Sequence, residues 1–160
     1  LVGVCSRRQM NFLARKTLFR SFPFGAIIRY LDAIPLDRDG MSLAGVKETL
    51  RRLRRGEIVI IFPEGTRSLD RTVGPLKPGF VALARRGRVP ILPVAMDGAA
   101  EAWPRKKWFP RPWTIRLSYG PEITLEQMNE LSDDELVAEV HRRIVECVED
   151  ARRFRGVTTE

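Results

Sequence analysis

An acid, a glycine and an arginine follow directly on a short apolar run in the first half of the chain. Residues 58–61 read Ile-Val-Ile-Ile, and residues 62–68 read Phe-Pro-Glu-Gly-Thr-Arg-Ser. The run is too short to span a membrane and is β-branched throughout, so it predicts a central strand that is covered on both faces of a sheet. Ligands of open α/β sheets bind beyond the carboxyl ends of the strands. The sequence therefore places a candidate site at residues 62–68.

The residue types in this segment suit a ligand that carries both a phosphate and a hydroxyl group. Gly65 lets the backbone approach an anion closely, and Arg67 can bind the anion through two parallel hydrogen bonds. Glu64 can accept a hydrogen bond from a hydroxyl group. The segment thus predicts a polyol phosphate site, and the alternative is an ordinary strand-to-loop junction with a surface Glu64–Arg67 pair.

Further segments accompany this one in a specific order. They are residues 11–19 (NFLARKTLF), 33–38 (AIPLDR), 74–79 (GPLKPG) and 89–95 (VPILPVA). Together with FPEGTRS at 62–68, the set resembles the glycerophosphate acyltransferase superfamily, and most closely its bacterial lysophosphatidate acyltransferases. The resemblance covers about residues 9–98 of the chain.

The resemblance implies a fold and a reaction. The expected fold is α/β, a single domain with a mixed, mostly parallel sheet flanked by helices, as in glycerol-3-phosphate acyltransferases. The implied enzyme is a 1-acyl-glycerol-3-phosphate O-acyltransferase of phospholipid biosynthesis. It passes a fatty acyl group from an acyl thioester to a lysophospholipid acceptor and yields phosphatidic acid. The thioester of coenzyme A (acyl-CoA) or of acyl carrier protein (acyl-ACP) is a co-substrate, and no bound cofactor or metal is expected.

Residue roles follow from the resemblance position by position. The residues expected to bind the substrate are Lys16, Arg38, Glu64, Gly65, Thr66, Arg67 and Lys77. Of these, Lys16 and Lys77 are additional phosphate candidates. Pro63 and Pro93 are expected to shape the pocket.

The catalytic motif of this superfamily, a histidine and an aspartate separated by four residues, precedes its counterpart of residues 11–19. No catalytic residue is therefore expected in this chain, which we interpret as N-terminally truncated. The alternative is a pseudoenzyme, a non-catalytic module that binds anionic lipid. His141 is the one histidine of the chain, with Glu146 five positions later. Residues five apart on a helix project about 140° from each other, so Glu146 would not orient His141, which is expected to be solvated and to have no catalytic role.

Composition and periodicity predict how the rest of the chain is organised. Residues 1–125 are expected to form the acyltransferase domain lacking its N-terminal catalytic motif, and residues 126–160 a C-terminal helix that packs on the same domain and ends in a frayed tail. Helices are expected at 42–55, 80–87 and 132–155, and strands at 89–95 and 114–119. The first helix should bury Leu43, Val46, Leu50 and Leu53, and Trp113 should be part of the core. Cys5 and Cys147 are expected to be buried free thiols.

The net charge of +8 favours acidic partners. All three tryptophans lie between residues 103 and 113, interleaved with lysines and arginines, which is typical of an interfacial loop at an anionic membrane surface. Packing of these aromatics onto the sheet is the alternative. The expected membrane contacts are Trp103, Lys106, Lys107 and Trp108, at the cytoplasmic face of the membrane, with the protein held peripherally. Binding of single-stranded nucleic acid would explain neither Glu64 nor the strand motifs, so no nucleic-acid partner is expected.

Overall fold

The computed structural model describes residues 10–15, 34–36, 43–66, 72–104, 109 and 111–156. The chain divides into two compact units. One comprises Leu1–Arg67 and Lys77–Val89, and the other Ser68–Leu76 and Pro90–Glu160. The predicted division of the chain at residue 125 differs from these bounds and stays a prediction. The predicted frayed tail beyond residue 156 lies outside the described residues.

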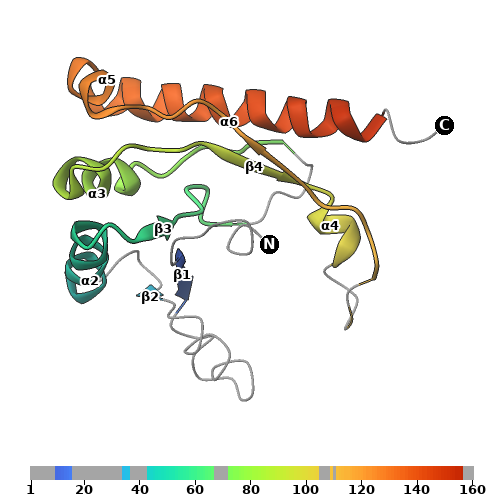
Figure 1. Ribbon diagram of the computed structural model, residues 1–160, viewed down its shortest axis with the longest axis horizontal. Helices are drawn as coiled ribbons and strands as arrows, with labels where there is room; N and C mark the ends of the chain where they lie inside the picture. Colours follow the sequence, from blue (N-terminus) through green and yellow to red (C-terminus); the bar gives the residue numbers. More distant parts are fainter. Residues whose placement is uncertain are drawn as a thin grey trace. The chain divides into compact units, whose positions relative to one another are not determined.

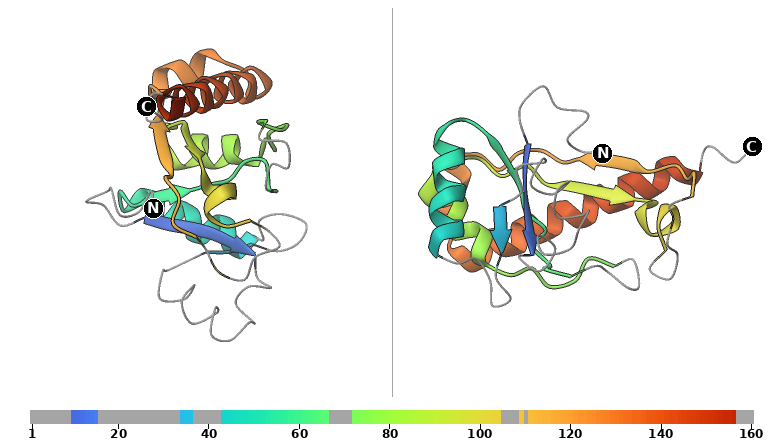
Figure 2. Two further views of the ribbon diagram at one scale, coloured as in Figure 1. Left: turned by 90° about the vertical axis from the view of Figure 1, so that its right-hand side faces the viewer. Right: turned by 90° about the horizontal axis from the view of Figure 1, so that it is seen from below.

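The first unit contains a parallel three-stranded sheet. Its strands are β1 (Met10–Arg15), β2 (Ile34–Leu36) and β3 (Ile58–Ile60), arranged in the order β2-β1-β3. Both pairings are parallel, and the arrows of β1 and β2 point the same way in Figure 2. Pro35 lies in an edge strand, where a residue without an N–H is tolerated. The predicted α/β class is therefore confirmed.

One expectation for this sheet is wrong. Residues 58–61 were expected to form a central strand covered on both faces, but β3 pairs only with β1 among the described residues and all three of its residues are half-buried. An apolar run indicates burial and does not fix the place of a strand in its sheet. The central place belongs to β1, whose Asn11 is completely buried.

The predicted helices of the first unit are confirmed as α2 (Leu43–Arg54) and α3 (Gly79–Gly87) (Figure 1). The predicted core stripe of α2 is wrong at Leu43, which is 82% exposed. The buried residues of α2 are instead Gly45 and Thr49, on a helix that contacts β2, β3 and α3. Small side chains on the packed face let a helix approach its neighbours closely, whereas Leu43 is the first residue of the helix and lies outside that face.

The second unit is built on an antiparallel pair of strands. Its elements are β4 (Val94–Asp97), α4 (Ala99–Ala102), β5 (Arg116–Tyr119), α5 (Leu125–Glu130) and α6 (Asp133–Gly156). α6 packs on β4 and β5, and it runs alongside them in Figure 1. β4 begins later than expected, because Pro90 and Pro93 cannot donate ladder hydrogen bonds. β5 begins at Arg116, which pairs with the last residue of β4, Asp97. The expectation that Trp113 is core is wrong: it precedes β5 and is 48% exposed.

The long closing helix α6 begins as the sequence predicted. Ser132 and Glu135 form a capping box, in which the Glu135 N–H donates to Ser132 Oγ at 3.3 Å and the Ser132 N–H donates to Glu135 Oε2 at 2.8 Å. Cys147 on this helix is a buried free thiol, as expected, and burial raises its pKa. None of the helices in the described residues combines the length and the apolarity needed to cross a bilayer.

Candidate functional site

Pro63, Glu64 and Gly65 form a tight turn directly after β3. The Gly65 N–H donates to the carbonyl oxygen of Phe62 at 3.0 Å, which places Pro63 at the second position of the turn. Proline favours that position because its ring already fixes φ. Gly65 has a φ of 66°, a left-handed conformation that residues with a Cβ adopt only at a cost. The sequence Pro-Glu-Gly therefore specifies this turn locally.

Lys77 reaches the turn from a later part of the chain. Its N–H donates to the Pro63 carbonyl oxygen at 2.9 Å. Its Nζ atom lies 3.0 Å from the point that a Cβ on Gly65 would occupy, so the side chain rests against the glycine. The structure thus brings together Pro63, Glu64, Gly65 and Lys77, with the exposed Thr66 next in sequence. The turn thus combines an acidic residue with the ammonium group of Lys77, residue types that suit a hydroxyl group and a phosphate.

The remaining phosphate candidates follow the ends of parallel strands in the sequence. β1 ends at Arg15 and β2 at Leu36, which face each other in the sheet. Lys16 comes directly after β1, Arg38 two residues after β2, and Arg67 after the turn. These three residues lie outside the described residues, and their roles stay predictions.

A buried polar network holds β3 in place. Asn11 Nδ2 donates to Glu57 Oε2 at 2.8 Å and to the Ile58 carbonyl oxygen at 3.3 Å, while Arg52 Nη1 donates to Asn11 Oδ1. Arg52 Nε also donates to Glu48 Oε1 at 2.8 Å. The Arg51 and Arg52 guanidinium groups lower the pKa of Glu48 to about 2. The sequence analysis did not predict this network. The one signal for it in the sequence was Asn11, a polar residue among the apolar residues of β1.

Pro93 and His141 belong to the second unit. Pro93 is buried, and its carbonyl oxygen accepts a hydrogen bond from the Gly120 N–H at 3.0 Å. His141 is half-buried rather than solvated as expected, and its Nε2 lies 3.4 Å from the Val73 carbonyl oxygen. Glu146 interacts with Arg142 at 2.5 Å, which agrees with its not orienting His141. The pocket-shaping role of Pro93 stays a prediction.

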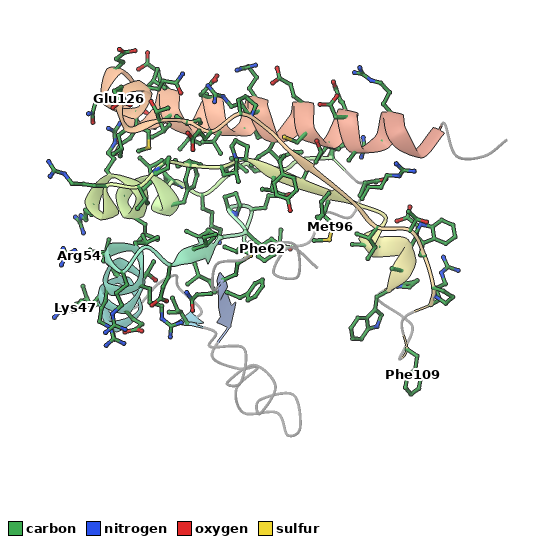
Figure 3. All side chains as sticks on the ribbon, in the orientation of Figure 1. Lys47, Arg54, Phe62, Met96, Phe109 and Glu126 are labelled. Carbon is green, nitrogen blue, oxygen red and sulfur yellow. The ribbon has the colours of Figure 1, made fainter. Side chains whose placement is uncertain are left out.

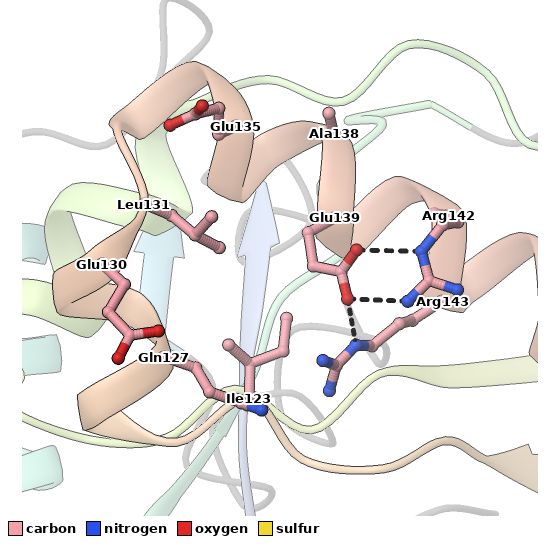
Figure 4. A pocket seen from close by; sticks show the side chains of 9 residues that line it. All are labelled: Ile123, Gln127, Glu130, Leu131, Glu135, Ala138, Glu139, Arg142 and Arg143. Carbon is pink, nitrogen blue, oxygen red and sulfur yellow. Dashed lines mark hydrogen bonds and ion pairs between the residues drawn. The ribbon is translucent and has the colours of Figure 1, made fainter.

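A hollow of about 440 Å³ lies between α5 and α6 (Figure 4). Its cations already have partners: Glu139 Oε1 accepts hydrogen bonds from Arg142 Nη2 and Arg143 Nε, both at 2.7 Å. These bonds, that of Arg142 first, lower the pKa of Glu139 to about 2. Because Glu139 and Glu146 together balance the charges of these two guanidinium groups, we assign no ligand to this hollow. The described residues also hold no cluster of three or more His, Cys, Asp or Glu side chains that could bind a metal ion.

The expected membrane contacts fall between β4 and β5. Trp103 is the C-cap residue of α4 and is 50% exposed. Lys106, Lys107 and Trp108 lie outside the described residues. The role of all four stays a prediction at this point.

The part of the chain that contains the turn and the strands β1 to β4 is similar to a known protein family. A family model described as Acyltransferase matches residues 1–97. That range includes β1 to β4, the turn and Lys77. The chain belongs to this acyltransferase family.

Curated relatives of the chain are described as 1-acyl-sn-glycerol-3-phosphate acyltransferase, among them the following two. The protein of Bacillus subtilis is 37% identical over 56% of this chain and 44% of its own length. The protein of Pseudomonas aeruginosa is 36% identical over 71% of this chain and 45% of its own length. The crystal structure of the 1-acyl-sn-glycerophosphate (LPA) acyltransferase PlsC from Thermotoga maritima superimposes with a TM-score of 0.74 and 27% identity, over 90% of this chain and 57% of that one. This chain therefore spans about half the length of the proteins it resembles.

Proposed function

We propose that this chain forms the acceptor-binding part of an enzyme that acylates 1-acyl-glycerol-3-phosphate. The product is phosphatidic acid, and the donor is a fatty acyl thioester of coenzyme A or acyl carrier protein. The observation that carries the proposal is the placement of the Lys77 ammonium group against Gly65, beside Glu64. The names of the relatives support the choice of acceptor.

The reaction has three chemical steps. An acceptor hydroxyl group must lose its proton, its oxygen must attack the thioester carbonyl carbon, and the thiolate must leave. The turn supplies acceptor positioning: Lys77 binds a phosphate oxygen, and the Glu64 carboxylate accepts a hydrogen bond from a glycerol hydroxyl group. Lys16, Arg38 and Arg67 are the proposed further cations for the phosphate. We assign no catalytic base to the described residues, among which Glu146 pairs with Arg142 and does not orient His141.

A lysine substitution tests this assignment. In the intact gene product, Lys77→Ala should lower kcat/KM for lysophosphatidate about 10- to 100-fold, because a hydrogen bond to a charged group is lost. Lys47→Ala, which removes an exposed lysine of α2, should leave kcat/KM within about two-fold of the parent value. The assay follows phosphatidic acid formed from lysophosphatidate and oleoyl-coenzyme A.

An acceptor without phosphate separates binding of the phosphate from general damage. With monoacylglycerol as acceptor, Lys77→Ala and the parent protein should differ by less than about two-fold. An equal loss with both acceptors would mean that Lys77 supports the fold of the turn instead. A parent protein that forms no phosphatidic acid yet binds lysophosphatidate would favour the non-catalytic module.

A further inference from the structure

The segment between β4 and β5 begins and ends at paired strand residues. Asp97 and Arg116 are partners in the antiparallel register of the two strands. Next to them, a Cβ on Gly98 would come within 2.3 Å of the Thr114 carbonyl oxygen, and Gly98 has a φ of 87°. The two ends of the segment thus touch, and only glycine fits at the contact.

A second tie lies further along the same segment. The Arg111 N–H donates to the Ala102 carbonyl oxygen at 2.8 Å, and Arg111 Nε donates to the Glu101 carbonyl oxygen at 2.7 Å. The guanidinium group of Arg111 also lies over the indole ring of Trp113, 5.3 Å from the ring centroid. Trp113 is therefore held by a cation and is not packed into a core.

The side chains that this segment presents are aromatic and exposed. Trp103 and Trp113 are about half exposed, and Phe109 is 78% exposed. Figure 3 shows Phe109 beyond α4, with its ring directed away from that helix. Large aromatic side chains usually bury most of their area, so exposure of three of them in one short segment indicates an interaction surface.

The charge of the segment defines the partner. Residues 99–113 contain one acid, Glu101, and four cations, Arg105, Lys106, Lys107 and Arg111. Indole rings with lysines and arginines suit the headgroup region of an anionic bilayer. Stacking on nucleic-acid bases is disfavoured for Trp113, because Arg111 already covers one face of its ring. The choice of lipid also rests on the proposed function, whose acceptor is a lipid.

We propose that the loop at residues 99–113 docks on anionic membranes through its described aromatic residues Trp103, Phe109 and Trp113, which insert at the level of the lipid headgroups. The hydrogen bonds of Arg111 tie the residues just before β5 to α4.

The tryptophan content of the chain gives a direct measurement. Because every tryptophan lies between residues 103 and 113, the intrinsic emission reports on this loop alone. Titration with vesicles of phosphatidylcholine and phosphatidylglycerol should shift the emission to shorter wavelength, and brominated acyl chains should quench it. Vesicles of phosphatidylcholine alone should bind at least about ten-fold more weakly, and 0.5 M salt should weaken binding to the anionic vesicles.

Matched variants locate the contact. Phe109→Ser should weaken vesicle partitioning about ten-fold, with an unchanged far-UV spectrum. Leu43→Ser removes an equally exposed apolar side chain from α2, and Lys47→Ser with Arg54→Ser removes two cations that extend outward from α2 (Figure 3). Both controls should stay within about two-fold of the parent chain.

Three outcomes would overturn the proposal. One is vesicle binding without quenching, which would place the contact elsewhere on the chain. Another is an equal loss for Phe109→Ser and the α2 controls. The third is quenching by a single-stranded oligonucleotide and none by vesicles. None of these binding measurements needs an acyl donor. In a separate activity assay in detergent, Phe109→Ser should keep the kcat/KM of the parent protein for lysophosphatidate. Failure of the loop proposal is therefore distinguishable from failure of the proposed function.

Discussion

The Nζ atom of Lys77 lies 3.0 Å from the position that a Cβ on Gly65 would occupy. Gly65 therefore has two roles, since it supplies a left-handed turn residue and leaves the space in which the lysine lies. The Lys77 N–H also donates a hydrogen bond to the Pro63 carbonyl oxygen, which ties the backbone of residue 77 to the turn. A side chain at residue 65 would affect the turn and the ligand-binding cation together.

Gly65→Ala should cost about 1–2 kcal/mol of stability through its positive φ and should also weaken binding of lysophosphatidate by displacing Lys77. Gly56→Ala is the matched control, because Gly56 has a φ of 77° and no atom within 4 Å of its Cβ position. Chemical denaturation should give similar stability losses for both variants. Calorimetric titration with lysophosphatidate should show weaker binding only for Gly65→Ala, and equal binding by the two would contradict the role of Lys77.

Asn11→Ala should lower the free energy of unfolding by about 2–3 kcal/mol, because Glu57, Arg52 and the Ile58 carbonyl oxygen each lose a hydrogen bond in a partly buried place. Urea denaturation followed by circular dichroism measures the loss. Arg51→Ala, which breaks an exposed pair with Glu48, should change stability by less than about 0.5 kcal/mol. A loss below 0.5 kcal/mol for Asn11→Ala would show that the network does not stabilise the sheet.

Glu139→Gln should make the free energy of unfolding less dependent on pH in the acidic range. The folded pKa of Glu139 is about 2 and its ordinary value is 4.5, so the folded chain binds fewer protons and the stabilisation is present above pH 4.5. It is lost as the pH falls from about 4.5 to about 2. At pH 7 the variant should be about 1 kcal/mol less stable than the parent, and the difference should vanish near pH 2.

The control for the pH experiment is Glu149→Gln, which changes an exposed carboxyl group of the same helix. Its effect should stay below about 0.5 kcal/mol at every pH. Thermal unfolding at a series of pH values measures both variants. A constant difference between parent and Glu139→Gln across the range would refute the linkage.

Gly98→Ala should destabilise the second unit by about 3 kcal/mol, since its Cβ would overlap the Thr114 carbonyl oxygen and its φ is positive. Gly79→Ala, at the start of α3 with no atom within 4 Å of the Cβ position, should be neutral or slightly stabilising. Differential scanning calorimetry compares the two. Similar melting temperatures for both variants would contradict the prediction, because they would mean that the contact between residue 98 and the Thr114 carbonyl oxygen can be given up at no cost in stability.

The sequence by itself determined the local elements and the family. Proline, glycine and serine at set positions specify the 62–65 turn and the capping box of Ser132, because these residues act on their own backbone neighbourhood. Helical periodicity placed α2, α3 and α6 within a few residues of their observed bounds. The ordered motifs indicated the acyltransferase family, which the match over residues 1–97 shows.

Tertiary structure alone decided which faces are buried and which distant residues meet. Leu43 and Trp113 are large apolar residues and yet are exposed, while Asn11 and Thr49 are completely buried. Lys77 meets Gly65 because residues 77–89 return to the first unit. Burial depends on what distant segments cover, and such packing follows from the summed area and shape of many neighbours, which no local pattern contains.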